Sequence, residues 1–260
     1  HDRPAPGVFF APLMKSRRLP SALGRRPLVV ASIGDAAHLA VDARRAAKDG
    51  ADVVEIRADL FPKSVLKPEP LRRLIKSVRE AAHRPLLLTL RIGEEGGGLS
   101  PHFREQDRLA LFRAALSDVQ GVDIELSANE INRHVEFEAH KRGRFVVVSA
   151  HDFGKTPSNT VLSGLARKAK RLGADVLKVA ARPRRRIDVE RLMDFCAKSG
   201  FRRRVFIAMR PLGDATRRDG FRWGSCLTYG FVRRRLAPGQ LPVKALAEAS
   251  RALLRKAAPS

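Results

Sequence analysis

The sequence predicts an α/β protein built as a (β/α)8 TIM barrel. Eight short apolar runs rich in Val, Leu and Ile alternate with amphipathic helical segments along 260 residues, a usual length for one such barrel. Apolar runs of this kind are typical of parallel strands that are buried on both faces. The alternation indicates parallel pairing through right-handed crossovers. An open doubly wound sheet is the alternative, but no glycine-rich turn follows the first strand to bind a dinucleotide.

The chain divides into two parts. Residues 1–26 are Pro-rich and irregular, and we expect them to form an N-terminal extension that covers the barrel bottom, with a short strand at 8–11. We expect residues 27–260 to form the (β/α)8 barrel domain, with any chemistry carried by this part. The predicted strands are apolar runs at 27–34, 51–59, 85–91, 122–126, 144–149, 174–180, 204–209 and 225–231. The predicted helices lie at 36–49, 68–82, 104–118, 129–142, 159–172, 187–198 and 243–256, with a polar loop at 212–220.

Several local signals support these bounds in the first half of the chain. Asp35 is expected to cap the first helix, and Gly50 follows that helix at the position where a left-handed residue ends helices. In the second strand, alternation places Glu55, Arg57 and Asp59 on one face. Such charges must pair with each other or meet a polar ligand.

The next strands carry further charged residues. The third ends in Arg91 and opens onto a carboxylate-bearing, glycine-rich loop that contains Glu95. This loop is no phosphate cradle, because it is negative and lacks a following Lys-Ser/Thr pair. The fourth strand places Asp123 and Glu125 on one face.

Two further strands hold the residues most out of place in a buried sheet. The fifth opens onto His151, and the sixth contains Lys178. In an α/β barrel, strand ends that face the mouth carry the chemistry. A lysine in apolar surroundings loses its preference for the ammonium form and becomes an amine nucleophile, and a histidine can move protons near neutral pH. The pair suggests Schiff-base chemistry; the structural alternative is a snorkelling lysine and a capping histidine.

Composition limits which other classes of protein the chain can belong to. Lys and Arg outnumber Asp and Glu by 51 to 27, for a net charge of +24, which invites a nucleic-acid interpretation. The basic residues are spread over nearly every helix, and no basic motif is interleaved with aromatic residues, so we favour a charged solvated surface and an anionic substrate. Two cysteines give neither a disulfide framework nor a metal spacing, which fits a reducing cytoplasm. No apolar run is long enough for a membrane helix.

His134 and His140 lie beside acidic residues on one predicted helix. Their spacing separates them by more than one turn, so we interpret both as surface residues rather than metal ligands.

Five motifs, in this order and at these spacings, resemble the type I 3-dehydroquinate dehydratases of the shikimate pathway. The resemblance covers roughly residue 27 to the C-terminus. The motifs are 54–59 (VEIRAD), 88–97 (LTLRIGEEGG), 149–157 (SAHDFGKTP), 174–180 (ADVLKVA) and 237–240 (APGQ).

The resemblance implies a lyase that dehydrates 3-dehydroquinate to 3-dehydroshikimate. Lys178 would form an imine with the substrate ketone, His151 would transfer the protons, and Glu95 would orient His151. For substrate binding it implies Arg217 as the carboxylate clamp, Glu55, Arg57 and Arg91 around the ring hydroxyls and the imine, and Gln240 as a lid residue. It also implies a homodimer and no metal or organic cofactor.

The chain departs from the resembled motifs at two places. Leu236 stands where the lid usually has Ser, so weaker substrate binding is expected. Strand seven ends in Met209-Arg210-Pro211, where the motif has a Met-Gly ending, and Arg218 competes with Arg217 for the role of clamp. Two other functions stay open: another Schiff-base barrel with a shifted carbonyl substrate, and a basic barrel that binds nucleic acid.

Overall fold

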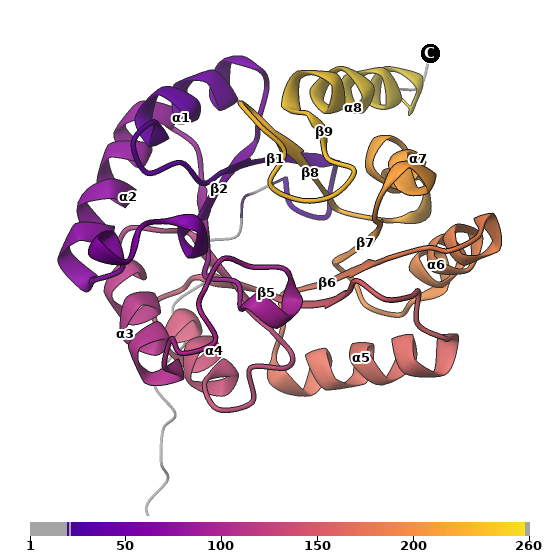
Figure 1. The fold of residues 1–260 in the computed structure, drawn as a ribbon. Helices are drawn as coiled ribbons and strands as arrows, with labels where there is room; N and C mark the ends of the chain where they lie inside the picture. Colours follow the sequence, from indigo (N-terminus) through magenta and orange to yellow (C-terminus); the bar gives the residue numbers. More distant parts are fainter. Residues whose placement is uncertain (1–19, 21, 258–260) are drawn as a thin grey trace, which may run out of the picture.

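The structure is a computed structural model that describes residues 20 and 22–257. One parallel sheet curls into a barrel (Figure 1), with the strand order β7-β6-β5-β4-β3-β2-β1-β8-β9. The strands are β1 (Leu28–Ile33), β2 (Val53–Arg57), β3 (Leu86–Thr89), β4 (Gly121–Glu125), β5 (Phe145–Asp152), β6 (Val176–Ala181), β7 (Arg204–Ala208), β8 (Leu227–Phe231) and β9 (Leu241–Pro242). The predicted α/β barrel is therefore confirmed.

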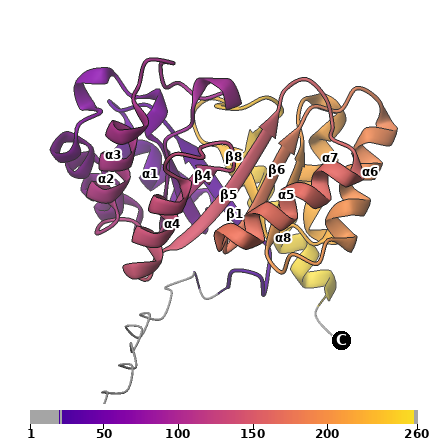
Figure 2. The same cartoon turned by 90° about the horizontal axis from the view of Figure 1, so that it is seen from below.

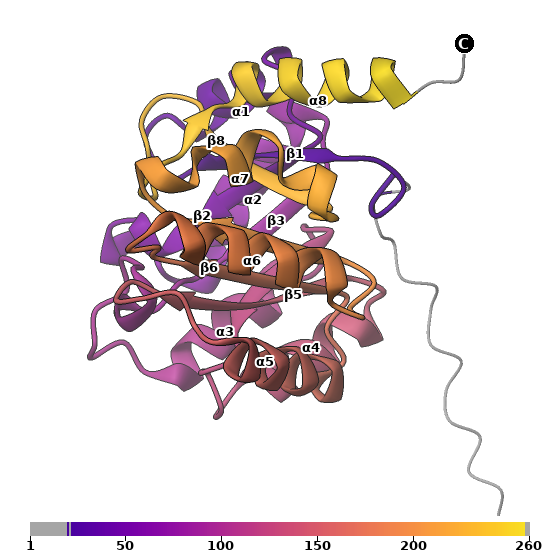
Figure 3. The ribbon, with the colours of Figure 1, turned by 90° about the vertical axis from the view of Figure 1, so that its right-hand side faces the viewer.

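Helices surround the strands, as seen from below in Figure 2. They are α1 (Leu39–Lys48), α2 (Pro68–Ala82), α3 (Glu105–Ala115), α4 (Asn132–Lys141), α5 (Asn159–Leu172), α6 (Arg186–Lys198), α7 (Asp214–Arg218) and α8 (Val243–Ala257). Figure 3 shows α8, α7, α6 and α5 covering one side of the barrel. Across the described residues, no helix combines the length and the apolar character that crossing a bilayer requires.

The barrel closes unequally on the two sides of β8. β8 pairs with β1 in parallel over five residue pairs, from Leu28–Leu227 to Ser32–Phe231. Among the described residues, β7 and β8 form no strand pairing of their own, and a single bridge joins Arg204 of β7 to Ser225, which precedes β8. Here side-chain hydroxyls accept hydrogen bonds from β7 amides in place of a neighbouring strand. Ser225 Oγ accepts one from the Phe206 amide at 3.2 Å, and Thr216 Oγ1 accepts one from the Ala208 amide at 3.0 Å.

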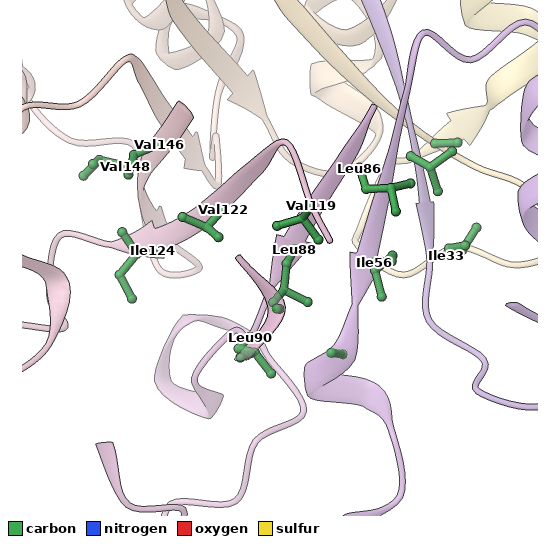
Figure 4. Close-up of a cluster of buried hydrophobic side chains, with 14 of the residues drawn as sticks. Ile33, Ile56, Leu86, Leu88, Leu90, Val119, Val122, Ile124, Val146 and Val148 are labelled. Carbon is green, nitrogen blue, oxygen red and sulfur yellow. The ribbon is translucent and has the colours of Figure 1, made fainter. Parts of the chain in front are cut away.

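Apolar side chains fill two regions. One cluster lies between the sheet and the helices, and Figure 4 shows part of it, including Ile56, Leu88, Val122 and Val148. A second cluster fills the lower barrel interior. Leu23, in the described part of the predicted extension, is 5% exposed and belongs to this inner cluster, so this part packs against the barrel interior. The predicted strand at 8–11 lies outside the described residues.

A polar layer sits above the inner apolar cluster because inward-facing positions recur every second residue of a strand. On β5 the inward series runs from Val147 through Ser149 to His151, and Lys178 pairs with Ser149 from the neighbouring strand β6. β5 therefore packs with its first inward residue and presents polar groups with its last two, whereas on β6 the polar Lys178 is followed by the inward-facing Ala180. This layer forms the floor of the candidate site.

Two local predictions are wrong. The first helix begins at Leu39 with His38 at the cap position, so Asp35 is not its N-cap and instead accepts a hydrogen bond from the Ala37 amide at 3.2 Å. The segment predicted as a polar loop at 212–220 contains α7. This short helix is held by tertiary contacts, including those of Thr216 described above, which its polar composition does not reveal.

Candidate active site

A pocket opens at the carboxyl ends of the barrel strands. All eight residues predicted for the site line it: Lys178, His151, Glu95, Glu55, Arg57, Arg91, Arg217 and Gln240. This is the face on which barrel enzymes place their chemistry. Ser32, Tyr229 and Met209 also line it.

Lys178 is buried on β6, with 6% of its surface exposed. Its Nζ lies 2.9 Å from Asp123 Oδ2, 3.9 Å from Glu55 Oε1 and 4.2 Å from the centre of the Tyr229 ring. The prediction of apolar surroundings is therefore only half right, because the amine is buried beside carboxylates. These contacts fix the direction in which the amine points.

Arg91 and Asp123 link the floor of the pocket into one network. Arg91 donates to Asp123 at 2.8 Å, to Glu125 at 3.1 Å and to Ser149 at 2.6 Å. Burial alone would raise the pKa of Asp123, but the positive charges of Arg91 and Lys178 outweigh it and hold that pKa well below its usual range. Asp123 is therefore a permanent carboxylate, and each buried charge in this network has a partner, as burial requires.

His151 and Glu95 form a dyad at the mouth of the pocket. The His151 ring donates from Nδ1 to Glu95 Oε2 at 2.8 Å, and the His151 backbone amide donates to the same oxygen at 3.0 Å. Ser127 donates to the other carboxylate oxygen. Glu95 therefore fixes the ring orientation, and Nε2 is the ring nitrogen that no described residue hydrogen-bonds.

Burial sets the charge of this dyad. It lowers the pKa of His151 well below the ordinary value of 6.5, and the nearby charges of Arg91 and Lys178 lower it further. Burial also raises the pKa of Glu95, against the opposing hydrogen bond from Ser127. His151 is thus a neutral imidazole at neutral pH, with a free nitrogen able to accept a proton.

Arg217 is buried at 3% exposure, whereas Arg218 is exposed and does not line the pocket. Arg217 donates to the backbone oxygens of Tyr229 at 3.4 Å and Pro238 at 2.9 Å. It forms no ion pair with any described residue, and its Nε has no partner among them. Burial lowers its pKa to about 10, with only partial compensation from the charge of Asp214. Arg217 is thus a buried cation that pairs with no carboxylate among the described residues.

Gln240 ties the loop after β8 to the barrel. Its side-chain oxygen accepts hydrogen bonds from the amides of Leu236 at 2.7 Å and Ala237 at 3.1 Å. Its amide nitrogen donates to Ser32 Oγ at 3.3 Å. Gln240 therefore links this loop to Ser32 of β1 beside the pocket, which both residues line.

The charged residues of the predicted second strand are buried, and two of them pair with each other, as expected. Arg57 donates to both oxygens of Asp59, at 2.9 and 2.7 Å. Glu55 accepts hydrogen bonds from Ser32 at 2.5 Å and Thr89 at 2.8 Å. Glu55 is thus held by two hydroxyls.

Arg210, at the altered end of strand seven, has φ of 68° and ψ of −179°. Residues other than glycine rarely adopt this backbone conformation, which costs them about 1–3 kcal/mol. Arg210 therefore stands at a position whose backbone conformation suits glycine.

The sequence did not assign four residues that the structure brings into or beneath the site. Ser32, Thr89, Ser149 and Tyr229 carried no charge to mark them; Asp123 was noticed only as part of a polar face. The prediction that His140 lies on the surface is wrong: it is 4% exposed, with Nδ1 2.6 Å from Glu136 and Nε2 2.9 Å from Asp175. His134 is exposed, as expected.

Comparisons with known proteins point to one enzyme family. The sequence profile described as type I 3-dehydroquinase matches residues 28–256. A 3-dehydroquinate dehydratase of Methanosarcina acetivorans is 36% identical over 208 residues, which span 77% of this chain and 84% of that protein. One of Bacillus subtilis is 34% identical over 203 residues, or 75% of this chain and 78% of that protein.

A solved structure shares the fold. The crystal structure of 3-dehydroquinate dehydratase from Geobacillus kaustophilus has a TM-score of 0.83 and 28% identity, and the match covers 90% of this chain and 93% of that one.

Proposed function

The chain belongs to the type I 3-dehydroquinase family, and from that premise we propose that it dehydrates 3-dehydroquinate through a Schiff base on Lys178. The observation that carries the proposal is one pocket that holds a buried primary amine, a neutral histidine and a buried arginine without an anion. The substrate offers a ketone, an acidic carbon-bound proton and a carboxylate to these three groups.

Lys178 is the nucleophile. Its amine adds to the C3 carbonyl, a C–N bond forms, and the carbonyl oxygen leaves as water to give a protonated imine. The imine nitrogen withdraws electrons from the adjacent carbon and acidifies its C2 proton. Asp123, 2.9 Å from Nζ, keeps the amine directed into the pocket. No metal or organic cofactor enters the proposed reaction, since the imine itself accepts the electrons.

His151 moves the protons. The neutral ring takes the C2 proton at Nε2, and the resulting imidazolium gives a proton to the C1 hydroxyl, which leaves as water. Glu95 accepts the Nδ1 hydrogen bond at 2.8 Å and offsets the charge of the imidazolium that forms. Hydrolysis of the product imine then frees Lys178.

Arg217 binds the substrate carboxylate. A guanidinium suits a carboxylate in a two-point contact, and Arg217 has an unpartnered Nε and no competing carboxylate among the described residues. Glu55, Arg57 and Arg91 bind near the ring hydroxyls and the imine, and Gln240 closes the loop over the substrate.

The deciding experiment is borohydride reduction of the protein with 3-dehydroquinate, followed by intact and peptide mass spectrometry. We expect an adduct on the peptide that carries Lys178 and growing ultraviolet absorbance of the enone product in an unreduced sample. Lys178→Ala should lose both, while Lys155→Ala, an exposed lysine of the same barrel face, should keep both. Retained turnover in Lys178→Ala refutes the imine.

His151→Ala separates proton transfer from imine formation. Turnover should fall at least about 100-fold, the usual contribution of a positioned proton-transfer group, while an imine can still form. Normal turnover would move this role to another residue. A panel of other carbonyl acids separates this function from a Schiff-base barrel with a different substrate.

We further propose a cytoplasmic homodimer that binds nucleic acid only nonspecifically. Two buried free thiols, Cys196 and Cys226, suit a reducing compartment; the dimer rests on the family resemblance. Sedimentation equilibrium measures the oligomeric state. Binding to random nucleic acid that disappears with added salt, beside normal turnover, supports a nonspecific interaction.

A further inference from the structure

Tyr229 lies directly beside the proposed nucleophile. The side chain comes from β8 and belongs to the inner apolar cluster, with 3% of its surface exposed. It also lines the pocket. Lys178 Nζ lies 4.2 Å from the centre of its ring, on the ring face. An aromatic face at this distance attracts a cation, most strongly where water is excluded.

The hydroxyl of Tyr229 does not explain this placement. It is buried, and no described residue hydrogen-bonds it. Burial raises the pKa of the phenol well above its usual value, and the charges of Glu55 and Asp123 raise it further. The side chain therefore meets Lys178 as a neutral ring, and its attraction for a cation comes from the electrons of the ring face.

We propose that the Tyr229 ring is a positioning residue that stabilises the protonated imine on Lys178. This inference rests on the proposed function and goes beyond it. In the resting site the Lys178 ammonium is paired with Asp123 at 2.9 Å. The unprotonated amine that attacks the carbonyl and the neutral carbinolamine that follows carry no positive charge on nitrogen, whereas the imine does once the carbonyl oxygen has left as water. The ring therefore favours the imine over the uncharged forms, and only such a difference between states speeds a reaction.

Loss of the contact between the ring and the cation should change imine formation by a measurable factor. A desolvated cation–π contact corresponds to roughly a 30-fold change in an equilibrium constant. We therefore expect Tyr229→Leu, which removes the ring, to lower borohydride trapping and kcat by roughly 10- to 30-fold. KM should change less, because Arg217 still binds the carboxylate.

Tyr229→Phe is the matched variant. It keeps the ring and should retain the trapping that Tyr229→Leu loses. Its melting temperature should equal or exceed that of the wild type, because an unpartnered buried hydroxyl is removed. If Phe loses as much trapping as Leu, the hydroxyl contacts the substrate and the ring proposal is overturned.

A graded series guards against misfolding of the Leu variant. Phenylalanines with one, two and three ring fluorines at position 229 keep the shape and progressively weaken the cation attraction of the ring. Trapping should fall stepwise along the series; equal trapping in all members overturns the proposal. Wild-type protein that forms no adduct overturns the proposed function as well, whereas wild-type trapping with a flat series overturns only the role of the ring.

Discussion

Replacing Asp123 by Asn tests whether the floor of the pocket is an electrostatic unit. Asp123 accepts hydrogen bonds from Lys178 at 2.9 Å, Arg91 at 2.8 Å and Ser149 at 2.6 Å. At such a distance two unit charges attract each other by about 6 kcal/mol at an effective dielectric constant near 20. Desolvation offsets much of this, but removing one partner leaves buried cations uncompensated, which costs about 3–5 kcal/mol. Asp123→Asn should lose this much stability.

The assay is urea unfolding at pH 7, repeated at pH 5. The pKa of Asp123 lies well below its usual range because Arg91 and Lys178 outweigh the effect of burial. Its contribution is therefore present above the pKa of the unfolded state, about 3.9, and is lost only as pH falls through the lower folded value, so the deficit should persist at pH 5.

A double-mutant cycle with Lys178→Met isolates the pair. The effects of the two changes on the free energy of unfolding should be non-additive, with a coupling energy of about 1 kcal/mol or more. The reason is that removing the lysine also removes one of the buried cations that Asp123→Asn leaves without a partner. A loss below about 1 kcal/mol in Asp123→Asn, or strictly additive effects, would refute the electrostatic account of this floor.

Three further predictions concern charge and backbone shape. Arg217→Met should lower kcat/KM roughly 100-fold, the scale of lost hydrogen bonds to a charged group, while Arg218→Met leaves it unchanged; equal effects in steady-state kinetics would reassign the clamp. Because the pKa of His151 is lowered, the base stays neutral until pH falls below 6.5, so the acidic limb of the kcat/KM profile should have its midpoint below that pH. A midpoint above it contradicts a buried neutral base. Arg210→Gly should raise the unfolding free energy by about 1 kcal/mol through relief of the strained φ, whereas Arg210→Ala, which keeps the strain, should not; thermal unfolding compares the two.

The barrel could be predicted because its signals are local. A run such as 145–148 identifies a buried strand by itself, and glycines such as Gly173, which adopts φ of 89°, mark the helix ends. Lys178 and His151 stood out because charged side chains are rare in buried strands. Their roles, and those of Glu95 and Arg217, came from the resemblance to a family rather than from composition or spacing.

The contacts within the site could not be predicted because the partners are distant in sequence. Asp123 meets Lys178 across 55 positions and Arg91 across 32. His140 was misjudged for the same reason, since its partner Asp175 lies 35 positions away. Tyr229 carries no charge and fits the pattern of an ordinary packed strand. Its place beside the amine follows from how the barrel curls, which no local pattern encodes.

The pairing of β8 with β1 also determines when the fold can be completed during synthesis. The first strand of the barrel finds its neighbour at Leu227–Phe231, almost at the end of the chain. Until those residues have been made, β1 and the most recently made strand, finally β7, are open sheet edges, the kind of surface on which strands of other chains pair. Contacts between such distant segments also slow folding. The nascent chain therefore passes through a long stage with two unprotected edges, and the arrival of β8 ends it by covering β1 while the hydroxyls of Ser225 and Thr216 occupy amides of β7.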